Sequence, residues 1–156
     1  MDYFNGNCGY NKTYKNIDDV MERFLTVVFL VWMCYLSLPA RTYIVSVGIA
    51  DYPGRQNDLR VSANDAKTIS GIFTKNGNAT VDSFVNSDVT IQKVCTAMRN
   101  TFAKASPSDA IILYFSGHGV PGGLVCYDGF LYYSSVLNIM RQSKAQQKMI
   151  FVDACF

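Results

Sequence analysis

The sequence predicts an α/β sandwich in which helices cover both faces of a mainly parallel central sheet. Three observations predict it. Residues 42–50 are dense in β-branched side chains, which is typical of a strand. Residues 111–115 are five apolar residues in succession, as expected for a strand buried on both faces of a parallel sheet. Between these runs, apolar residues recur at helical spacing, and strands that alternate with helices favour a parallel sheet.

Two helices and a second strand are expected between these two runs. Residues 51–60 predict a loop, and a helix is expected to begin near Ser62 or Asn64, both good capping residues. Residues 79–85 predict the second strand. Thr90 is expected to cap an amphipathic helix, whose apolar positions are Ile91, Val94, Cys95, Met98 and Phe102.

After the central strand the helical pattern gives way to a hairpin. Asp128-Gly129 separates two short apolar runs, which predicts a two-residue hairpin with a type I′ turn. Ser134 or Ser135 is expected to cap a short helix. Residues 148–152 predict the last strand.

The amino-terminal segment differs in character from the rest. Residues 1–20 are polar and lack periodicity, so we expect them to be unstructured or part of an over-extended gene model with translation starting at Met21. Residues 24–38 are almost wholly apolar and a small residue follows, as in a secretory signal. A membrane anchor stays open, although a spanning helix needs roughly 20 apolar residues. We expect a signal peptide or anchor over 21–40, a domain over 41–156, and a secreted, periplasmic, envelope or membrane-anchored location.

Composition excludes several kinds of protein. A chain of 156 residues with 49% hydrophobic residues supports one domain with an ample core, and 17% charged residues argue against disorder. The net charge of +2, without a cluster of Lys and Arg, argues against a nucleic-acid partner. The five cysteines show neither CxxC nor zinc-finger spacing. We therefore expect no metal site and no cofactor.

Two reactive side chains follow two of the predicted strands. His118, the only histidine, stands between two glycines just after the central strand. Cys155 follows the last strand. Because parallel strands end at the same edge of a sheet, where open α/β sheets place their chemistry, an imidazole and a thiol are brought together. This pair predicts a nucleophile and its base.

Two other functions fit parts of the same stretch. Residues 117–122 match GxGxxG after a strand, but a dinucleotide site needs a helix that opens at the third glycine. Pro121 and the hairpin follow instead, so a nucleotide-binding α/β domain is a remote alternative. A serine hydrolase acting through Ser116 is excluded, because the GxSxG elbow is absent.

With Ser-Gly-His-Gly after one strand and Asp-Ala-Cys after the next, the chain resembles the caspase-like cysteine peptidases. The resemblance is closer to the metacaspase and bacterial caspase-homologue branch than to animal caspases, and it covers residues 42–156. Asn64-Asp65 also matches metacaspase-type sequences.

The resemblance implies a role for each matching residue. Cys155 would be the nucleophile, and His118 would assist thiolate formation and protonate the leaving amine. The backbone amides of Gly119 and Cys155 would form the oxyanion hole. Asp65 and Asp153 would line a pocket for a basic side chain, which implies cleavage after Arg or Lys. The alternative for Asp65 is a carboxylate that favours a helix start, and for Asp153 a loop cap.

The chain also departs from the family pattern. The family domain continues after its cysteine with strands that complete the sheet, whereas this sequence stops at Phe156. We therefore expect the missing carboxyl-terminal segment and a protein or peptide substrate as partners, and little activity from the chain as it stands. A catalytically inactive truncated remnant or a regulatory pseudo-peptidase is the rival function. No acidic loop follows His118, so calcium dependence is not expected.

Overall fold

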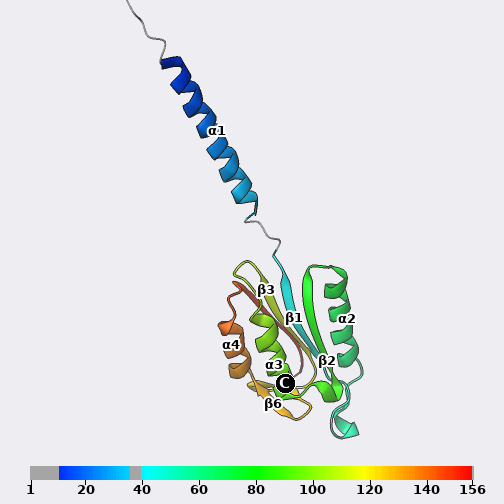
Figure 1. Cartoon of the computed structure of the whole chain (residues 1–156). Coiled ribbons are helices and arrows are strands. Elements are labelled where there is room, and N and C mark those ends of the chain that lie inside the picture. The colour runs from blue at the N-terminus through cyan, green and yellow to red at the C-terminus, as the bar shows by residue number, and fades with distance from the viewer. Residues whose placement is uncertain (1–10, 36–39, 156) are drawn as a thin grey trace, which may run out of the picture. The chain divides into compact units, whose positions relative to one another are not determined.

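The computed structural model describes residues 11–35 and 40–155 (Figure 1). The chain divides into two compact units, residues 1–39 and residues 40–156. The second unit contains a four-stranded sheet of order β2-β1-β3-β7 and a three-stranded sheet of order β4-β5-β6. In chain order the elements are α1 (Asn11–Tyr35), β1 (Thr42–Gly48), η1 (Arg55–Asn57), α2 (Ser62–Lys75), β2 (Ala79–Val85), η2 (Asn86–Asp88), α3 (Ile91–Phe102), β3 (Ala110–Ser116), β4 (Gly119–Val120), β5 (Gly123–Cys126), β6 (Gly129–Tyr132), α4 (Tyr133–Gln142) and β7 (Gln147–Asp153).

The larger sheet is parallel throughout, because β1 pairs in parallel with β2 and β3, and β3 with β7. β1 and β3 lie in the middle, and their apolar side chains are buried on both faces. The four strands begin and end within two residues of the positions predicted from the sequence. The predicted α/β fold with a mainly parallel sheet is confirmed.

Helix α2 covers one face of this sheet, close to β1. The Ser46 hydroxyl donates to the Ala66 carbonyl at 2.9 Å. A Cβ at Gly48 would lie only 2.3 Å from the Ser62 carbonyl oxygen, so this close approach requires glycine. The expectation that Ser62 or Asn64 caps the helix is wrong, because Val61 occupies the capping position without a side-chain bond. Ser62 is buried in the first turn instead.

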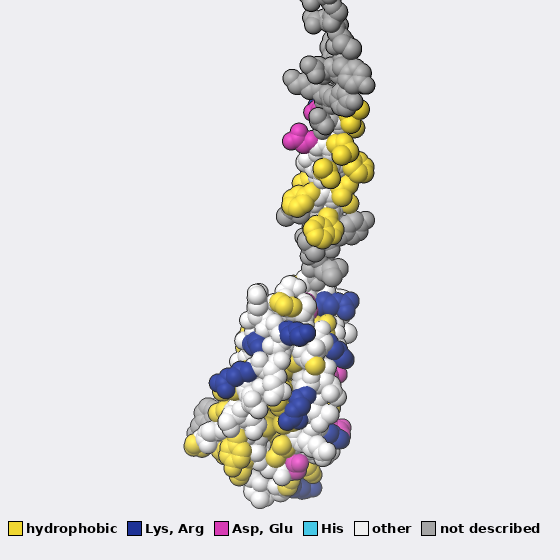
Figure 2. All heavy atoms as spheres, turned by 60° about the vertical axis from the view of Figure 1, so that its left-hand side comes forward, with side chains coloured by type: hydrophobic (Ala, Val, Ile, Leu, Met, Phe, Trp, Pro, Cys, Tyr) yellow, Lys and Arg dark blue, Asp and Glu magenta, His cyan; other side chains and the backbone are white. Residues whose placement is uncertain are grey.

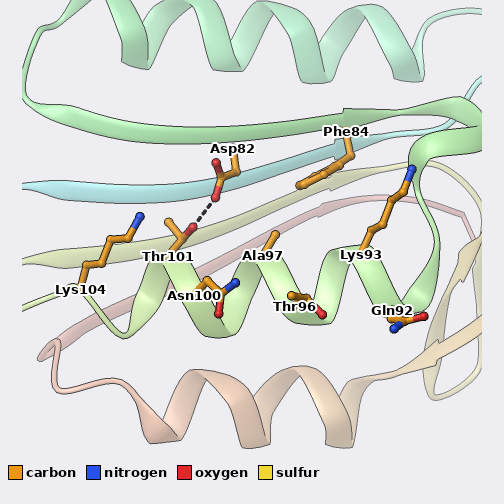
Figure 3. A pocket seen from close by; sticks show the side chains of 9 residues that line it. All are labelled: Asp82, Phe84, Gln92, Lys93, Thr96, Ala97, Asn100, Thr101 and Lys104. Carbon is orange, nitrogen blue, oxygen red and sulfur yellow. Dashed lines mark hydrogen bonds between the residues drawn. The ribbon is translucent and has the colours of Figure 1, made fainter.

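Helix α3 covers the opposite face, and α4 packs beside it (Figure 3). The Thr90 hydroxyl accepts a hydrogen bond from the Lys93 amide at 3.3 Å, which confirms the predicted cap of α3. Further along, the Thr101 hydroxyl donates to the carboxylate of Asp82 on β2, a contact that Figure 3 draws. The core lies between α3, α4 and the sheet, and its largest fully buried side chains on this side include Met98, Phe102, Leu113 and Phe115.

The predicted hairpin is formed by β5 and β6, which pair antiparallel. Its turn is not type I′, because that turn needs positive φ at both central residues and neither Tyr127 nor Asp128 has it. Asp128 instead ties the hairpin to α3, since its carboxylate accepts from the Ile91 amide at 2.8 Å. Helix α4 then begins at Tyr133 without a side-chain cap, so the expected cap at Ser134 or Ser135 is also wrong.

Strand β7 differs from the other strands in its exposure. It lies at one edge of the sheet, and all but one of its residues are exposed. Three of them are apolar: Ile150, Phe151 and Val152, with exposed fractions of 37%, 50% and 37%. An edge strand with exposed apolar side chains is a site where another strand can pair.

The amino-terminal unit contains helix α1, whose apolar side chains lie on its surface (Figure 2). The helix begins at Asn11, so the expectation that residues 1–20 are unstructured is wrong for residues 11–20; residues 1–10 lie outside the described part. Once the apolar part of a helix has formed, each residue added to its end gains one backbone hydrogen bond. This explains how the polar residues 11–20 can extend the helix formed by the apolar residues that follow them. Among the described residues, no helix is both long and apolar enough to span a bilayer. A signal peptide or anchor over 21–40 stays a prediction, and residues 36–39 lie outside the described part.

Candidate active site

The carboxyl ends of β3 and β7 lie side by side, and their pairing continues beyond the strands. The amide of Gly117 donates to the carbonyl of Asp153 at 3.1 Å. Two residues later, the amide of Gly119 donates to the carbonyl of Cys155 at 3.2 Å. His118 therefore lies on a backbone segment that runs directly alongside the segment of Cys155. The thiol of Cys155 is free and exposed.

Four contacts hold His118 in place, one of which is the hydrogen bond that the Val125 amide donates to the His118 carbonyl at 3.0 Å. Its ring packs on the ring of Tyr52, with centroids 4.8 Å apart and planes tilted by 45°. The hydroxyl of Tyr52 accepts from the His118 amide at 2.9 Å and donates to the Val125 carbonyl at 3.2 Å. The imidazole Nε2 lies 2.8 Å from the carbonyl oxygen of Asn57. A loop on one side and the hairpin on the other thus fix the ring.

The contact with Asn57 decides which nitrogen of His118 can act as a base. A carbonyl oxygen can only accept a hydrogen bond, so Nε2 must carry the proton that it donates to Asn57. In the neutral imidazole the lone pair then belongs to Nδ1. That nitrogen is the one available to take a proton from a neighbouring thiol.

The hydroxyl of Tyr52 also explains why position 117 is glycine. A Cβ at Gly117 would lie 2.5 Å from this hydroxyl and 3.1 Å from the ring of Phe115. The hydroxyl cannot move away freely, because its two hydrogen bonds hold it and Tyr52 is buried. Burial raises the pKa of Tyr52 to about 12, so the phenol is neutral at physiological pH.

The backbone amide of Gly119 is not free to form an oxyanion hole in this conformation. Its N–H already donates to the carbonyl of Cys155. An N–H that makes this bond well cannot also point at the oxygen of a bound carbonyl. Residue 155 would have to shift before Gly119 could serve as predicted.

The two carboxylates predicted to line a substrate pocket come from different elements. Asp65 lies in the first turn of α2, and Asp153 is the last residue of β7. The pKa of the Tyr114 phenol on β3 is raised mainly by burial. The negative charges of Asp65 and Asp153 raise it further. The acids therefore lie near one partly buried tyrosine.

Two contributors to the site were missed in the sequence. Asn57 acts through its backbone carbonyl, so the type of residue at this position carries no signal. Tyr52 is an aromatic residue just beyond the end of the first strand, at the edge where chemistry is expected, and this position could have identified it. Within the described residues, no three His, Cys, Asp or Glu side chains are grouped so that they could hold a metal ion.

Comparison with known protein families gives a direct match at this point. A family model described as the caspase domain matches residues 41–156, which is most of the chain. The chain belongs to the caspase-domain family. This is a family of cysteine peptidases, and the match includes the strands that position His118 and Cys155.

Solved structures support the same fold. The chain is similar to the crystal structure of protein GSU0716 from Geobacter sulfurreducens, with a TM-score of 0.64 at 16% sequence identity. The similarity covers 74% of this chain and 50% of that protein, so this chain spans about half of its length. At this identity the comparison supports the fold alone. No curated protein matches the chain.

Proposed function

We propose that this caspase domain is a cysteine endopeptidase in which Cys155 and His118 form the catalytic dyad. The observation that carries the proposal is the backbone pairing that runs His118 alongside Cys155, combined with the contact of Nε2 to Asn57. A free, exposed thiol and an imidazole with its lone pair at Nδ1 are the components that thiolate formation requires.

The reaction follows from these groups. His118 takes the proton of the Cys155 thiol, and the thiolate adds to the carbonyl carbon of the scissile peptide bond. The tetrahedral intermediate collapses as His118 gives the proton to the leaving nitrogen, which releases an amine and leaves a thioester on Cys155. His118 then takes a proton from water as the water oxygen adds to the thioester carbon. The C–S bond breaks, the carboxylic acid is released, and His118 returns the proton to the Cys155 thiolate. The amides of Gly119 and Cys155 stabilise the oxyanion once the Gly119 amide has left the Cys155 carbonyl.

The proposal includes cleavage after Arg or Lys. After burial, Asp65 and Asp153 each raise the pKa of the Tyr114 phenol, which supports an acidic cluster of two carboxylates within electrostatic reach of one side chain. Two carboxylates near a partly buried aromatic ring favour a cationic side chain, by charge and by cation–π attraction. An acidic side chain directly before the scissile bond would be repelled by these two carboxylates.

A regulatory pseudo-peptidase is the second candidate function, and one observation favours it. The Gly119 amide is occupied by the Cys155 carbonyl, so the oxyanion donor is not preorganised. Most of the electrostatic benefit of an oxyanion hole depends on such preorganisation. A domain locked in this arrangement would keep the fold and bind peptides without turning them over.

The test uses fluorogenic peptides that end in Arg, Lys or Asp before the reporter group. The peptidase proposal expects only slow cleavage by this chain, because the Gly119 amide is occupied, but cleavage that is selective for Arg and Lys. Cys155→Ala and His118→Ala should each remove it, since loss of either member of a catalytic dyad lowers the rate by about 10³-fold or more. Asp153→Ala should selectively lower cleavage after Arg, whereas the exposed Asp88→Ala should not. Retained cleavage in Cys155→Ala, or a preference for Asp, contradicts the proposal. A wild-type chain that binds an Arg peptide without cleaving it supports the pseudo-peptidase.

A further inference from the structure

A cavity of about 460 Å³ opens beside His118 on the side of the hairpin. His118, Tyr52 and Asn57 line one wall, and the antiparallel strands contribute Val125 and Phe130. Pockets of about 300–1,000 Å³ are large enough to enclose a small organic group. The cavity is separate from the acidic cluster, because neither carboxylate of that cluster is among its lining residues.

The lining of this cavity carries no carboxylate, ammonium or guanidinium group. The titratable groups that line it are His118, Tyr127, the phenol of Tyr52 and the thiol of Cys126. The last two are buried. Burial raises the pKa of each to about 12, so both are neutral at physiological pH. The cavity is therefore suited to an uncharged, apolar occupant.

One large apolar side chain at this cavity is open to solvent. Phe130 of β6 is 52% exposed although it lies on the cavity wall. Covering an exposed aromatic ring with an apolar ligand removes its surface from water, which favours binding. The neighbouring Val120 and Val125 extend the same apolar wall.

We propose that this cavity is the leaving-side subsite of the peptidase, which binds the side chain of the residue directly after the scissile bond and prefers a large apolar one. The inference rests on the proposed function, because it uses the role of His118 as proton donor. The nitrogen that receives this proton must come within hydrogen-bond reach of the imidazole. The side chain of the residue that contributes the nitrogen is only two bonds away, within reach of a cavity that His118 and Gly119 both line.

The preference has a defined chemical class. Phenylalanine, leucine or a similar side chain would cover Phe130 and the two valines, whereas glycine would leave them exposed. An acidic side chain would lose water without gaining a cationic partner. The two sides of the cleaved bond are thus selected by opposite chemistry, a cation before the bond and an apolar group after it.

The binding test does not depend on turnover. Short amides that represent the released half of a substrate, with Phe, Gly or Glu at their free amino end followed by Ala, are titrated into the full chain. Amide NMR signals report where and how strongly they bind. We expect the Phe compound to bind about tenfold more tightly than the Gly compound, with the Glu compound weakest. The signals that shift should include those of Val120, Val125 and Gly129.

Two variants distinguish binding in the cavity from nonspecific binding to exposed aromatic side chains. Phe130→Ala should remove most of the preference for Phe over Gly. Tyr132→Ala is the matched control, because Tyr132 is an exposed aromatic residue on the same strand but does not line the cavity. Equal binding of the Phe and Gly compounds, no binding at all, or shifts confined to other regions would overturn the subsite. If the Phe compound binds more tightly than the Gly compound but no Arg peptide is cleaved, only the peptidase proposal is contradicted. If Arg peptides are cleaved but the Phe and Gly compounds bind equally, only the subsite is contradicted.

Discussion

Replacing Tyr52 by Phe tests how His118 is held. The change removes one hydroxyl and keeps the ring that packs on His118 with centroids 4.8 Å apart. The hydroxyl is the acceptor of the His118 amide and the donor to the Val125 carbonyl. The variant therefore isolates the polar link between the loop, the histidine and the hairpin from their apolar packing.

The magnitude follows from the two groups that lose their partner. A buried polar group left without a hydrogen bond costs about 1–3 kcal/mol. The sites are only partly buried, so water can compensate in part, and we expect Tyr52→Phe to lower the free energy of unfolding by about 2 kcal/mol. The His118 amide loses its acceptor, although the His118 carbonyl keeps its bond from the Val125 amide, so the rate of the proposed peptidase should fall by about tenfold.

The pH dependence gives a second, independent measurement. Burial raises the pKa of Tyr52 from 10.0 to about 12 in the folded chain. The neutral phenol is therefore favoured by folding, and its contribution is fully present below pH 10 and lost as the pH rises towards 12. A shift of this size corresponds to about 3 kcal/mol. The stability difference between wild type and Tyr52→Phe should be constant below pH 10 and should shrink above it.

Urea denaturation of the wild type and the variant, at intervals from pH 7 to pH 11.5, measures both effects. Tyr132→Phe serves as control, because Tyr132 is exposed and should change stability by less than about 0.5 kcal/mol. If Tyr52→Phe is as stable as the wild type at pH 7, or if the difference does not change above pH 10, the hydroxyl does not make the buried link described above.

Three further predictions concern the scaffold around the site. Gly48→Ala should destabilise the domain by more than about 2 kcal/mol in urea denaturation, since its Cβ would lie 2.3 Å from a carbonyl oxygen of α2; Gly71→Ala, with open space around it, should be neutral or stabilising. Asn86→Ala should lower the free energy of unfolding by about 1–3 kcal/mol in the same assay, because the Asn86 side chain accepts hydrogen bonds from two backbone amides and its backbone has a positive φ of 52°. An unchanged unfolding midpoint would contradict this. Phe151→Lys should reduce self-association in analytical ultracentrifugation, and equal association of both forms would show that the β7 edge is not responsible.

The positions of the strands could be predicted because local chemistry determines them. A β-branched run such as residues 42–48 has few alternatives to a strand, and the apolar run that follows Asp109 needs burial on both faces. The helix caps were harder, because tertiary packing competes with local preference. Ser62 is a good capping residue, but burial against β1 places it inside the helix instead.

The details of the site could not be predicted, because they are made by backbone atoms. The carbonyl that orients His118 belongs to Asn57, and any residue there would supply one. The exposure of β7 could not be predicted either, since a strand-like run such as residues 148–152 predicts a strand but not its neighbours in the sheet. Only the arrangement in space shows which amides and which edges are occupied.

The backbone pairing that runs His118 alongside Cys155 also restrains both residues. The bond from Gly117 to Asp153 continues the register of β3 and β7, so it keeps His118 beside the end of the last strand. The bond from Gly119 to Cys155, two residues further on, occupies the amide that an oxyanion would need. For Gly119 to serve as the proposed oxyanion donor, its bond to the Cys155 carbonyl has to break, whereas the bond from Gly117 to Asp153 can stay. Cys155 follows the last residue of β7 by two positions, so we expect a strand that pairs with the exposed edge of β7 to shift this segment and, with it, the Cys155 carbonyl.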